Sequence, residues 1–358
     1  MRPWRNLPRL LPAPIAGYYT GLADQTQRSF PMRAWRFHEF GPIENLVLEE
    51  ADMPVPAAGE ALVRVRYAAL NPADRYMVAG KYPRPAPRPF SVGRDACGII
   101  EQAAEGGRFK AGDEVIVLRS EVGVSRTGTL AQYVTVPEAS LAPLPAGWTP
   151  QEGAAGPLVM LTAWQGLVQR GNLQPGQTAL VTGTSGGVGS AAIQLAKGLG
   201  AKAIGMSRSE DKKARLLELG ADAIVDTDIA TFGAQVKEAL HGGRVDIVIE
   251  NLGGPWLEEC VKVCGVDGKI MVIGLLAGLS SEVTLGLLIF KCITIQGMNV
   301  GANTPEEAQE AWAGIVKTLE AVGQKPLIDS EFAFEDVQAA FARLQSGPFG
   351  KVVVKVAG

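Results

Sequence analysis

Short runs of alternating hydrophobic and polar residues characterise the chain from Met32 to about Pro143. Residues 61–67 alternate with a period of two, residues 114–118 follow a turn, and residues 130–136 end at a proline. A period of two places every second side chain on one buried face of a strand, and turn residues keep each strand short. This part of the sequence therefore predicts a small, partly closed β-barrel domain.

The hydrophobic pattern changes after Gly156. From there on, continuous apolar runs are separated by helical stretches. The apolar runs are residues 178–182, 201–207, 223–226, 245–250 and 269–274. Such runs are typical of strands in a parallel sheet that is covered on both faces. The helical stretches between them are residues 188–199, 210–219, 232–240 and 256–264. Repeated strand–helix–strand units predict an α/β fold with a doubly wound parallel sheet.

Local signals mark the ends of some of these helices. Ser209 is a suitable N-cap, acidic residues follow it in the first turn, and Gly220 comes directly after the last turn of that helix. Beyond residue 298 the chain is expected to return to the first domain. The elements expected there are helices over 305–322 and 334–345 and a strand over 351–356.

Length and composition limit the possible classes of protein. The 358 residues exceed the size of about 250–300 residues at which single cores stop growing, so two domains are expected. We place the first domain at residues 32–156, the second at 157–298, and the return to the first at 299–358. A net charge of −3 argues against a nucleic-acid partner, and the apolar runs are shorter than the roughly 20 residues of a membrane span. The four cysteines form no C-x-x-C pair, which favours free thiols in a reducing, cytoplasmic compartment.

Residues 1–31 differ from the rest of the chain. They carry arginines, almost no acidic residues and five prolines. An arginine-rich start is typical of transit peptides, and the apolar residues 10–17 weakly suggest a signal sequence, but prolines break the helix that either needs. We expect a loosely ordered extension, or an upstream start with Met32 as the true first residue.

Residues 183–187 read Gly-Thr-Ser-Gly-Gly and fit two kinds of site. As G-x-S-x-G they are the nucleophile elbow of a hydrolase, with Ser185 as the nucleophile. That chemistry requires a histidine base, and the chain has only His38 and His241. His38 precedes the serine, the wrong order for an α/β-hydrolase, and His241 is placed as a helix C-terminal residue. A serine nucleophile is therefore disfavoured.

A phosphate-binding loop explains more of the same stretch. Glycines let backbone N–H groups approach a pyrophosphate, and the helix expected from Val188 directs its positive end towards that charge. The spacing departs from strict G-x-G-x-x-G, but the loop joins a strand to a helix as that motif requires. The expected dinucleotide site includes Gly183, Ser185, Gly186, Gly187, Val188 and Gly189.

The end of the second strand should select between NAD and NADP. NAD sites carry an acid there that accepts a hydrogen bond from the ribose 2′-OH. Here the strand ends at Ser207 and Arg208, and Lys212 follows in the next helix. Arginine can bind a 2′-phosphate through two hydrogen bonds, and the lysine adds a second charge. The sequence thus predicts NADPH, the alternative being a solvated arginine and lysine at a helix start.

Five motifs follow one another along the chain, at residues 32–41, 71–83, 93–98, the glycine loop and 350–354. Together they resemble the medium-chain dehydrogenase/reductase superfamily in its zinc-independent, quinone oxidoreductase-like branch, from Met32 to the C-terminus. The resemblance implies a GroES-like β-domain, a Rossmann domain and a cofactor cleft between them. It also implies oligomers joined through the Rossmann sheet, with residues 283–301 as a candidate edge of a homodimer, the alternative being that this apolar stretch packs within its own domain. The remaining cofactor residues that we expect are Thr162, Asn251 and Gly274.

Zinc-bearing members of that superfamily hold their catalytic metal with two cysteines and a histidine. The matching positions here are Asn71, Arg94 and Leu158, none of which is a usual zinc ligand. The short segment 119–129 replaces the lobe that carries the structural zinc. We therefore expect no metal, and an ion pair between Arg94 and the adjacent Asp95.

Without a metal, hydrogen bonds must stabilise the oxyanion, which suits the reduction of quinones or α,β-unsaturated carbonyls. The resemblance places Tyr82 at the position of the catalytic tyrosine of trans-2-enoyl thioester reductases. It places Asn71 and Tyr76 among the polar residues that line quinone-reductase clefts. A phenol with a pKa of about 10 donates at neutral pH without being charged. The alternative is that both tyrosines only cover a loop.

Several functions remain open at this point. The leading one is an NADPH-dependent reductase that transfers hydride to a quinone or an enone. An enoyl thioester reductase or a zinc-independent alcohol dehydrogenase-like enzyme is a related alternative, and an NADPH-binding structural or regulatory protein with little turnover is a different one. The expected partner is a small-molecule substrate, with no nucleic acid and no membrane. Asp74 and Asp95 are expected to organise loops rather than to titrate.

Overall fold

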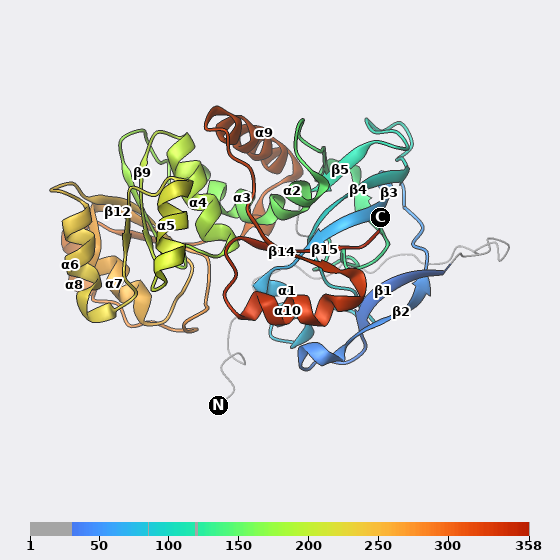
Figure 1. Ribbon diagram of the computed structural model, residues 1–358, viewed down its shortest axis with the longest axis horizontal. Helices are drawn as coiled ribbons and strands as arrows, with labels where there is room; N and C mark the ends of the chain where they lie inside the picture. Colours follow the sequence, from blue (N-terminus) through green and yellow to red (C-terminus); the bar gives the residue numbers. More distant parts are fainter. Residues whose placement is uncertain (1–30, 85, 119–120, 358) are drawn as a thin grey trace. The chain divides into compact units, whose positions relative to one another are not determined.

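The computed structural model describes residues 31–84, 86–118 and 121–357 (Figure 1). The expectation of a loosely ordered extension over residues 1–31 lies outside these residues except for its last position. Pro31 already belongs to a strand, β1 (Pro31–Phe37), which pairs antiparallel with β2 (Leu46–Asp52).

Six parallel strands form one sheet in the order β10-β9-β8-β11-β12-β13. They are β8 (Thr178–Val181), β9 (Lys202–Met206), β10 (Ala223–Val225), β11 (Val245–Glu250), β12 (Cys264–Val272) and β13 (Thr294–Gly297). The chain proceeds from β8 to one edge and then from β11, on the other side of β8, to the opposite edge. This reversal of strand order confirms the doubly wound Rossmann fold expected from the sequence.

Helices cover both faces of this sheet, which explains the apolar runs without alternation. The helices are α4 (Gly187–Gly198), α5 (Glu210–Leu219), α6 (Ile229–Ala239), α7 (Pro255–Val263) and α8 (Leu285–Lys291). Within β8, Ala179 and Val181 belong to the core that includes α4, whereas Leu180 belongs to the core that includes α6 and α7. Every position of the strand is therefore buried on one face or the other.

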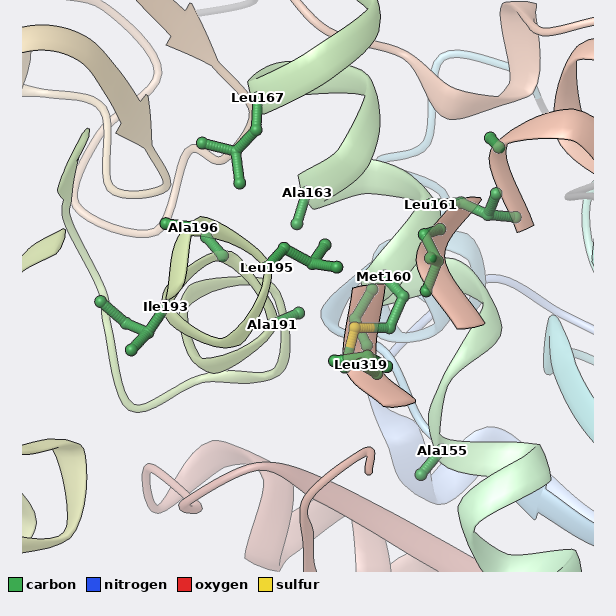
Figure 2. Close-up of a cluster of buried hydrophobic side chains, with 14 of the residues drawn as sticks. Ala155, Met160, Leu161, Ala163, Leu167, Ala191, Ile193, Leu195, Ala196 and Leu319 are labelled. Carbon is green, nitrogen blue, oxygen red and sulfur yellow. The ribbon is translucent and has the colours of Figure 1, made fainter. Parts of the chain in front are cut away.

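Two consecutive helices that we did not predict connect this sheet to the rest of the chain. α2 (Pro150–Ala155) packs on the other sheet, and α3 (Pro157–Trp164), extended by the π-helical turn η3 (Gln165–Arg170), packs on α4 and on α9 (Pro305–Ala321). Figure 2 shows Met160 of α3, Leu195 of α4 and Leu319 of α9 within this shared core. α3 is apolar on all sides, so its sequence lacks the periodicity that would have identified a helix.

The second sheet has seven strands, in the order β14-β15-β3-β4-β5-β7 with β6 on β3. They are β3 (Glu60–Ala69), β4 (Asp95–Gln102), β5 (Glu114–Val117), β6 (Tyr133–Pro137), β7 (Leu141–Pro143), β14 (Ile328–Ala333) and β15 (Lys351–Lys355). One side of β3 pairs with β4, while β6 and β15 share the other side. This is the partly closed β-domain expected from the sequence, completed by strands that follow the Rossmann sheet in the chain.

Short helices complete the fold. They are α1 (Pro72–Val78), α10 (Val337–Gln345) and the single turns η1 (Ile43–Asn45), η2 (Glu138–Ser140), η4 (Val300–Ala302) and η5 (Phe334–Asp336). No helix in the described part of the chain is long and apolar enough to cross a bilayer.

Candidate active site

The glycine loop lies between the end of β8 and the start of α4, and its conformation is fixed by one threonine. The Thr184 hydroxyl donates to the carbonyl of Val181 (2.8 Å) and accepts from the backbone N–H of Met206 (2.7 Å). Gly183 has a φ of 57°, which favours glycine. The loop is therefore attached to the carboxyl ends of β8 and β9, where dinucleotides bind in this fold.

The glycines of the loop have different surroundings. A Cβ on Gly189 would lie 2.4 Å from the Gly183 carbonyl oxygen, so this glycine lets α4 pack against the loop. A Cβ on Gly187 would meet Val159 at 2.8 Å and Lys351 at 3.0 Å. At Gly186, the N-cap of α4, only the Gly183 oxygen lies within 4 Å, at 3.5 Å. Gly186 thus leaves a hollow at the positive end of a 12-residue helix, which fits a pyrophosphate group.

Ser185 has a backbone role in this loop. Its carbonyl accepts a hydrogen bond from the backbone N–H of Gly350 (3.0 Å), the residue before β15. His38 lies 2.9 Å from Glu49 on β2, and His241 follows α6, so neither histidine is hydrogen-bonded to the serine among the described residues. This arrangement agrees with a phosphate-binding loop and not with a nucleophile elbow.

Asn251 and Gly274 lie at the carboxyl ends of β11 and β12, beside the loop. The Asn251 backbone N–H and side-chain amide donate to the hydroxyl and the carbonyl of Thr182, at 2.8 and 2.7 Å. A Cβ on Gly274 would lie 2.0 Å from the Asn251 carbonyl oxygen, so no other residue allows this approach. The hydroxyl of Thr162, in α3, donates to the Leu158 carbonyl (2.6 Å).

The residues at the end of β9 form a basic cluster. Arg208 is exposed, and the Ser207 hydroxyl accepts from the Ser209 backbone N–H (3.2 Å). Lys212 donates to the Gly347 carbonyl (2.7 Å). Partial burial lowers the pKa of Lys212, and Arg343, Arg208 and Arg215 lower it further, against an opposing effect of Asp329. This concentration of positive charge would be relieved by a bound phosphate.

A buried polar cluster connects the second sheet to the glycine loop. The Lys351 ammonium group donates to Asn71 Oδ1 (2.6 Å) and Asp95 Oδ2 (3.0 Å), and Asn71 Nδ2 donates to the same Asp95 oxygen (2.8 Å). The other Asp95 oxygen accepts from the Leu158 backbone N–H (2.9 Å). Lys351 also lies against Gly187. It therefore connects the loop to Asn71, one of the positions at which zinc-bearing members of the superfamily carry a metal ligand.

Arg94 is paired differently from our expectation. Its Nε lies 3.9 Å from Asp74 Oδ1, while Asp95 is paired with Lys351. The Arg94 guanidinium also lies over the ring of Tyr82, with 4.8 Å between its central carbon and the ring centroid. The expected pair of Arg94 and Asp95 is therefore wrong, because Lys351 from the end of the chain occupies the carboxylate.

Asp74 holds the first turn of α1 and has an unusual pKa. Its Oδ2 accepts from the Asn71 backbone N–H (2.8 Å) in a capping box. Burial raises its pKa from 3.8 to about 6, although Arg94, that hydrogen bond and Lys351 lower it. From the sequence we expected Asp74 to organise a loop and not to titrate. A pKa of about 6 places its titration near neutral pH, which corrects the second part of that expectation.

The two candidate tyrosines lie at the end of α1, and both are half-buried. The Tyr76 carbonyl accepts from the backbone N–H groups of Lys81 (2.8 Å) and Tyr82 (3.1 Å), which turns the chain after the helix. This turn brings the Tyr82 ring under Arg94. Tyr82 and Asn71 thus lie around one group of charged residues, and their catalytic roles stay predictions.

These residues do not fit a zinc ion. Two cations, Arg94 and Lys351, lie among Asn71, Asp74 and Asp95, and a positive charge next to the carboxylates opposes metal binding. No group of three or more histidine, cysteine or acidic residues suited to a metal occurs in the described ranges.

Sequence reasoning missed Lys351 and the surroundings of Arg94. Lys351 belongs to the terminal motif 350–354, but nothing in that motif shows that it contacts Asn71 and Asp95, which lie 280 and 256 positions earlier. Arg94 was recognised as a residue that replaces a metal ligand and as a partner of Asp95, but not as a neighbour of Asp74 and Tyr82.

Comparisons with known proteins agree with this fold. Residues 187–317 match the zinc-binding dehydrogenase family, and residues 57–146 match the alcohol dehydrogenase GroES-like domain. A quinone oxidoreductase of Rattus norvegicus is 31% identical over 90% of this chain and 97% of its own. An acryloyl-coenzyme A reductase of Sulfurisphaera tokodaii is 32% identical over 88% of this chain and 98% of its own. A mycobacterial protein crystallised with NADPH is 25% identical, with a TM-score of 0.82 over 91% of this chain and 100% of its own.

Proposed function

The chain belongs to the quinone oxidoreductase-like branch of the medium-chain dehydrogenase/reductase superfamily and is an oxidoreductase, and we propose that it is a metal-independent, NADPH-dependent reductase of quinones or α,β-unsaturated carbonyls. The observation that carries the proposal is the contact of Lys351 with both the glycine loop and the Asn71–Asp95 pair. It places neutral and cationic hydrogen-bond donors, and no metal-ligand set, beside the cofactor loop. Such donors can stabilise an oxygen that gains negative charge.

In this proposal the cofactor supplies the hydride, and the protein binds, orients and stabilises charge. The loop residues Gly183, Ser185, Gly186, Gly187, Val188 and Gly189 hold the pyrophosphate. Tyr82 donates a hydrogen bond to the reacting carbonyl oxygen, Asn71 lies beside it and orients Lys351 and Asp95, and Tyr76 lines the cleft. The remaining contacts with the cofactor are assigned to Thr162, Asn251 and Gly274.

NADPH is proposed over NADH because of the charges at the end of β9. Arg208 and Lys212 follow that strand where an acid would select NAD, and two further arginines lower the pKa of Lys212. A 2′-phosphate would neutralise part of this charge, whereas a 2′-OH would not. The relative crystallised with NADPH supports the same assignment.

An enoyl thioester reductase is the second candidate. It is supported by the similarity to an acryloyl-coenzyme A reductase and by Tyr82. An alcohol dehydrogenase-like activity and a binding protein with little turnover are further alternatives. NADPH oxidation should be measured with 1,2-naphthoquinone, with 2-alkenals and with crotonyl thioesters, in each case beside NADH. If the protein turned over none of these substrates, the proposed reductase activity would be contradicted.

We further propose that the protein is a cytoplasmic homodimer joined through the edge strand β13. Next to this edge, α8 exposes Leu285, Ile289 and Phe290, the last at 85%. An apolar patch beside an edge strand is suited to pairing with a second copy. All four cysteines are free thiols, which supports a reducing compartment.

A further inference from the structure

Arg94 has buried hydrogen-bond donors without partners. Its side chain is 7% exposed, and Nε and Nη2 donate to no acceptor among the described residues. Asp74 Oδ1, the nearest anionic oxygen, lies 3.9 Å from Nε and is likewise without a partner. A buried guanidinium with unused donors is costly, so such groups are usually satisfied by a further group.

Lys351 Nζ and Asn71 Nδ2 both have acceptors, which distinguishes them from Nε and Nη2 of Arg94. Lys351 and Asn71 both donate to Asp95, and Asp95 also accepts from the Leu158 backbone. Lys351 is therefore neutralised within the protein. Among the charged side chains of this site, Arg94 is the one with nitrogen atoms, Nε and Nη2, that have no acceptor at all among the described residues.

We propose that Arg94 is a catalytic residue whose guanidinium binds the substrate oxygen that becomes negative during reduction. The inference deepens the proposed function and depends on it. The ring of Tyr82 lies under the guanidinium and holds its plane, while Asp74 is too far away to accept its hydrogen bonds. Arginine keeps its charge at all physiological pH values, so the site is ready for an anion without a proton transfer.

The proposed step balances as follows. The substrate accepts a hydride from the dihydronicotinamide, so the cofactor is oxidised by two electrons and the substrate is reduced by two. A C–H bond of the cofactor breaks, and a C–H bond forms at the β-carbon of an enone or an O–H bond forms at one carbonyl oxygen of a quinone. The π electrons shift through the conjugated system to the enone carbonyl oxygen or to the other quinone oxygen. Arg94 stabilises this oxygen, in the enolate or in the hydroquinone anion, until a proton from solvent completes the product.

The competing explanation is a purely structural ion pair between Arg94 and Asp74. Removing only Arg94 would leave the Asp74 carboxylate buried and unpaired, and the protein could fail to fold. The informative variant is therefore Arg94→Met combined with Asp74→Asn, which removes both charges and keeps the approximate volumes. Arg94→Lys keeps the charge but loses the planar arrangement of donors. Arg108→Met is a matched control, because Arg108 also lies 4.8 Å from a ring centroid, that of Phe109, but is half-exposed.

A phenolate tests the site without turnover. 4-Nitrophenolate resembles the hydroquinone anion formed from a quinone. Its absorbance reports its charge when it is titrated with the protein in the presence of NADP⁺. We expect the wild type and Arg108→Met to bind the phenolate form in preference to the phenol. The double variant should bind the phenolate about 10- to 100-fold less tightly, as for lost hydrogen bonds to a charged group, and raise the pKa of the bound phenol by about one to two units. Arg94→Lys should fall between these values.

Unchanged phenolate affinity and unchanged pKa of the bound phenol in a folded double variant would overturn the role of Arg94. Circular dichroism and the midpoint of thermal unfolding establish that the variant is folded. Failure of the proposed function would be seen in a different measurement. The wild type would then reduce neither quinones nor enones, whatever its affinity for phenolate.

Discussion

Arg208 is the residue with which the choice of cofactor can be tested. Its side chain is exposed beside Lys212 at the end of β9. We expect Arg208→Ala to weaken NADPH binding by about 1.5–3 kcal/mol, the range for hydrogen bonds to charged groups, with little effect on NADH. Titration calorimetry with both cofactors measures the difference.

Lys213 provides the control for this prediction. It lies next to Lys212 on the same helix, but its ammonium group is paired with Glu210 (2.7 Å) and Asp226 (3.2 Å). Lys213→Ala should therefore leave the affinity for NADPH almost unchanged. An equal loss of NADPH and NADH binding in Arg208→Ala would show that the arginine does not read the 2′-phosphate.

Tyr82 can be tested by removing its hydroxyl alone. Phenylalanine keeps the ring under Arg94, so Tyr82→Phe separates hydrogen bonding from stacking. We expect kcat for enones to fall by about 10²- to 10³-fold, the loss typical of one oxyanion donor, with unchanged cofactor affinity. Quinones accept electrons more readily, and their reduction should be less affected. Wild-type rates with enones would leave Tyr82 as a residue that only lines the cleft.

At the residue scale, the sequence is informative where a function depends on neighbours in the chain. The loop from Gly183 to Gly189 could be predicted because glycines, a strand and a helix occur together. The contact of Lys351 with Asp95 could not, because it joins residues 256 positions apart. For the same reason the sequence suggested that Asp95 pairs with its neighbour Arg94.

At the scale of elements, the start of α4 separates a packing requirement from a binding requirement. An alanine Cβ at Gly186 would meet only one atom within 4 Å, whereas at Gly189 it would lie 2.6 Å from the Thr184 Cα. We expect Gly186→Ala to change the free energy of unfolding by less than about 1 kcal/mol but to weaken NADPH at least about 10-fold. Gly189→Ala should instead lower the thermal midpoint. Denaturant unfolding and calorimetry give the two quantities, and tight NADPH binding by Gly186→Ala would contradict the assigned hollow.

Asp74, in the first turn of α1, should make stability depend on pH. Its pKa is raised from 3.8 to about 6 in the folded protein. Between these values the folded protein keeps a proton that the unfolded chain loses, so the free energy of unfolding falls as pH rises, and it is flat above pH 6. Relative to Asp74→Asn, the wild type should lose about 2–3 kcal/mol across this interval. Urea unfolding of both proteins from pH 4 to pH 8 measures this difference, and parallel curves would contradict the raised pKa.

The elements that the sequence predicted well have periodicity and end signals of their own. The predicted helix 210–219 and strand 245–250 agree with α5 and β11. The helix predicted over 232–240 instead begins at Ile229, because Asp228 accepts from the Ala230 backbone N–H (3.0 Å) as its N-cap. α3 was missed because it is apolar on all sides, whereas α2 was missed although Thr149 and Glu152 form a capping box at its start, with Pro150 as the first helical residue. The boundaries 156/157 and 298/299 of the expected domains stay predictions.

At the scale of the whole molecule, the apolar surface of α8 should decide the oligomeric state. Phe290 is the most exposed of the three exposed large apolar residues on this helix, and β13 beside it is a sheet edge. We expect Phe290→Glu to convert a dimer into a monomer, because the buried charge would oppose association. Light scattering after size-exclusion chromatography measures the mass. Glu282→Gln, an exchange at the surface before α8, is the control and should not change the mass. A monomeric wild type would contradict the proposed dimer.

The position of Lys351 after the six-stranded sheet in the sequence has a consequence for biosynthesis. The ribosome makes the glycine loop and Asn71 long before it makes β15, yet Gly350 and Lys351 complete the contacts of both. A nascent chain with a finished six-stranded sheet therefore still lacks the residue that joins its loop to the polar cluster. Contacts between distant positions also form late in folding, because closing long loops costs entropy first. Translation thus delays the assembly of the site until β15 has left the ribosome.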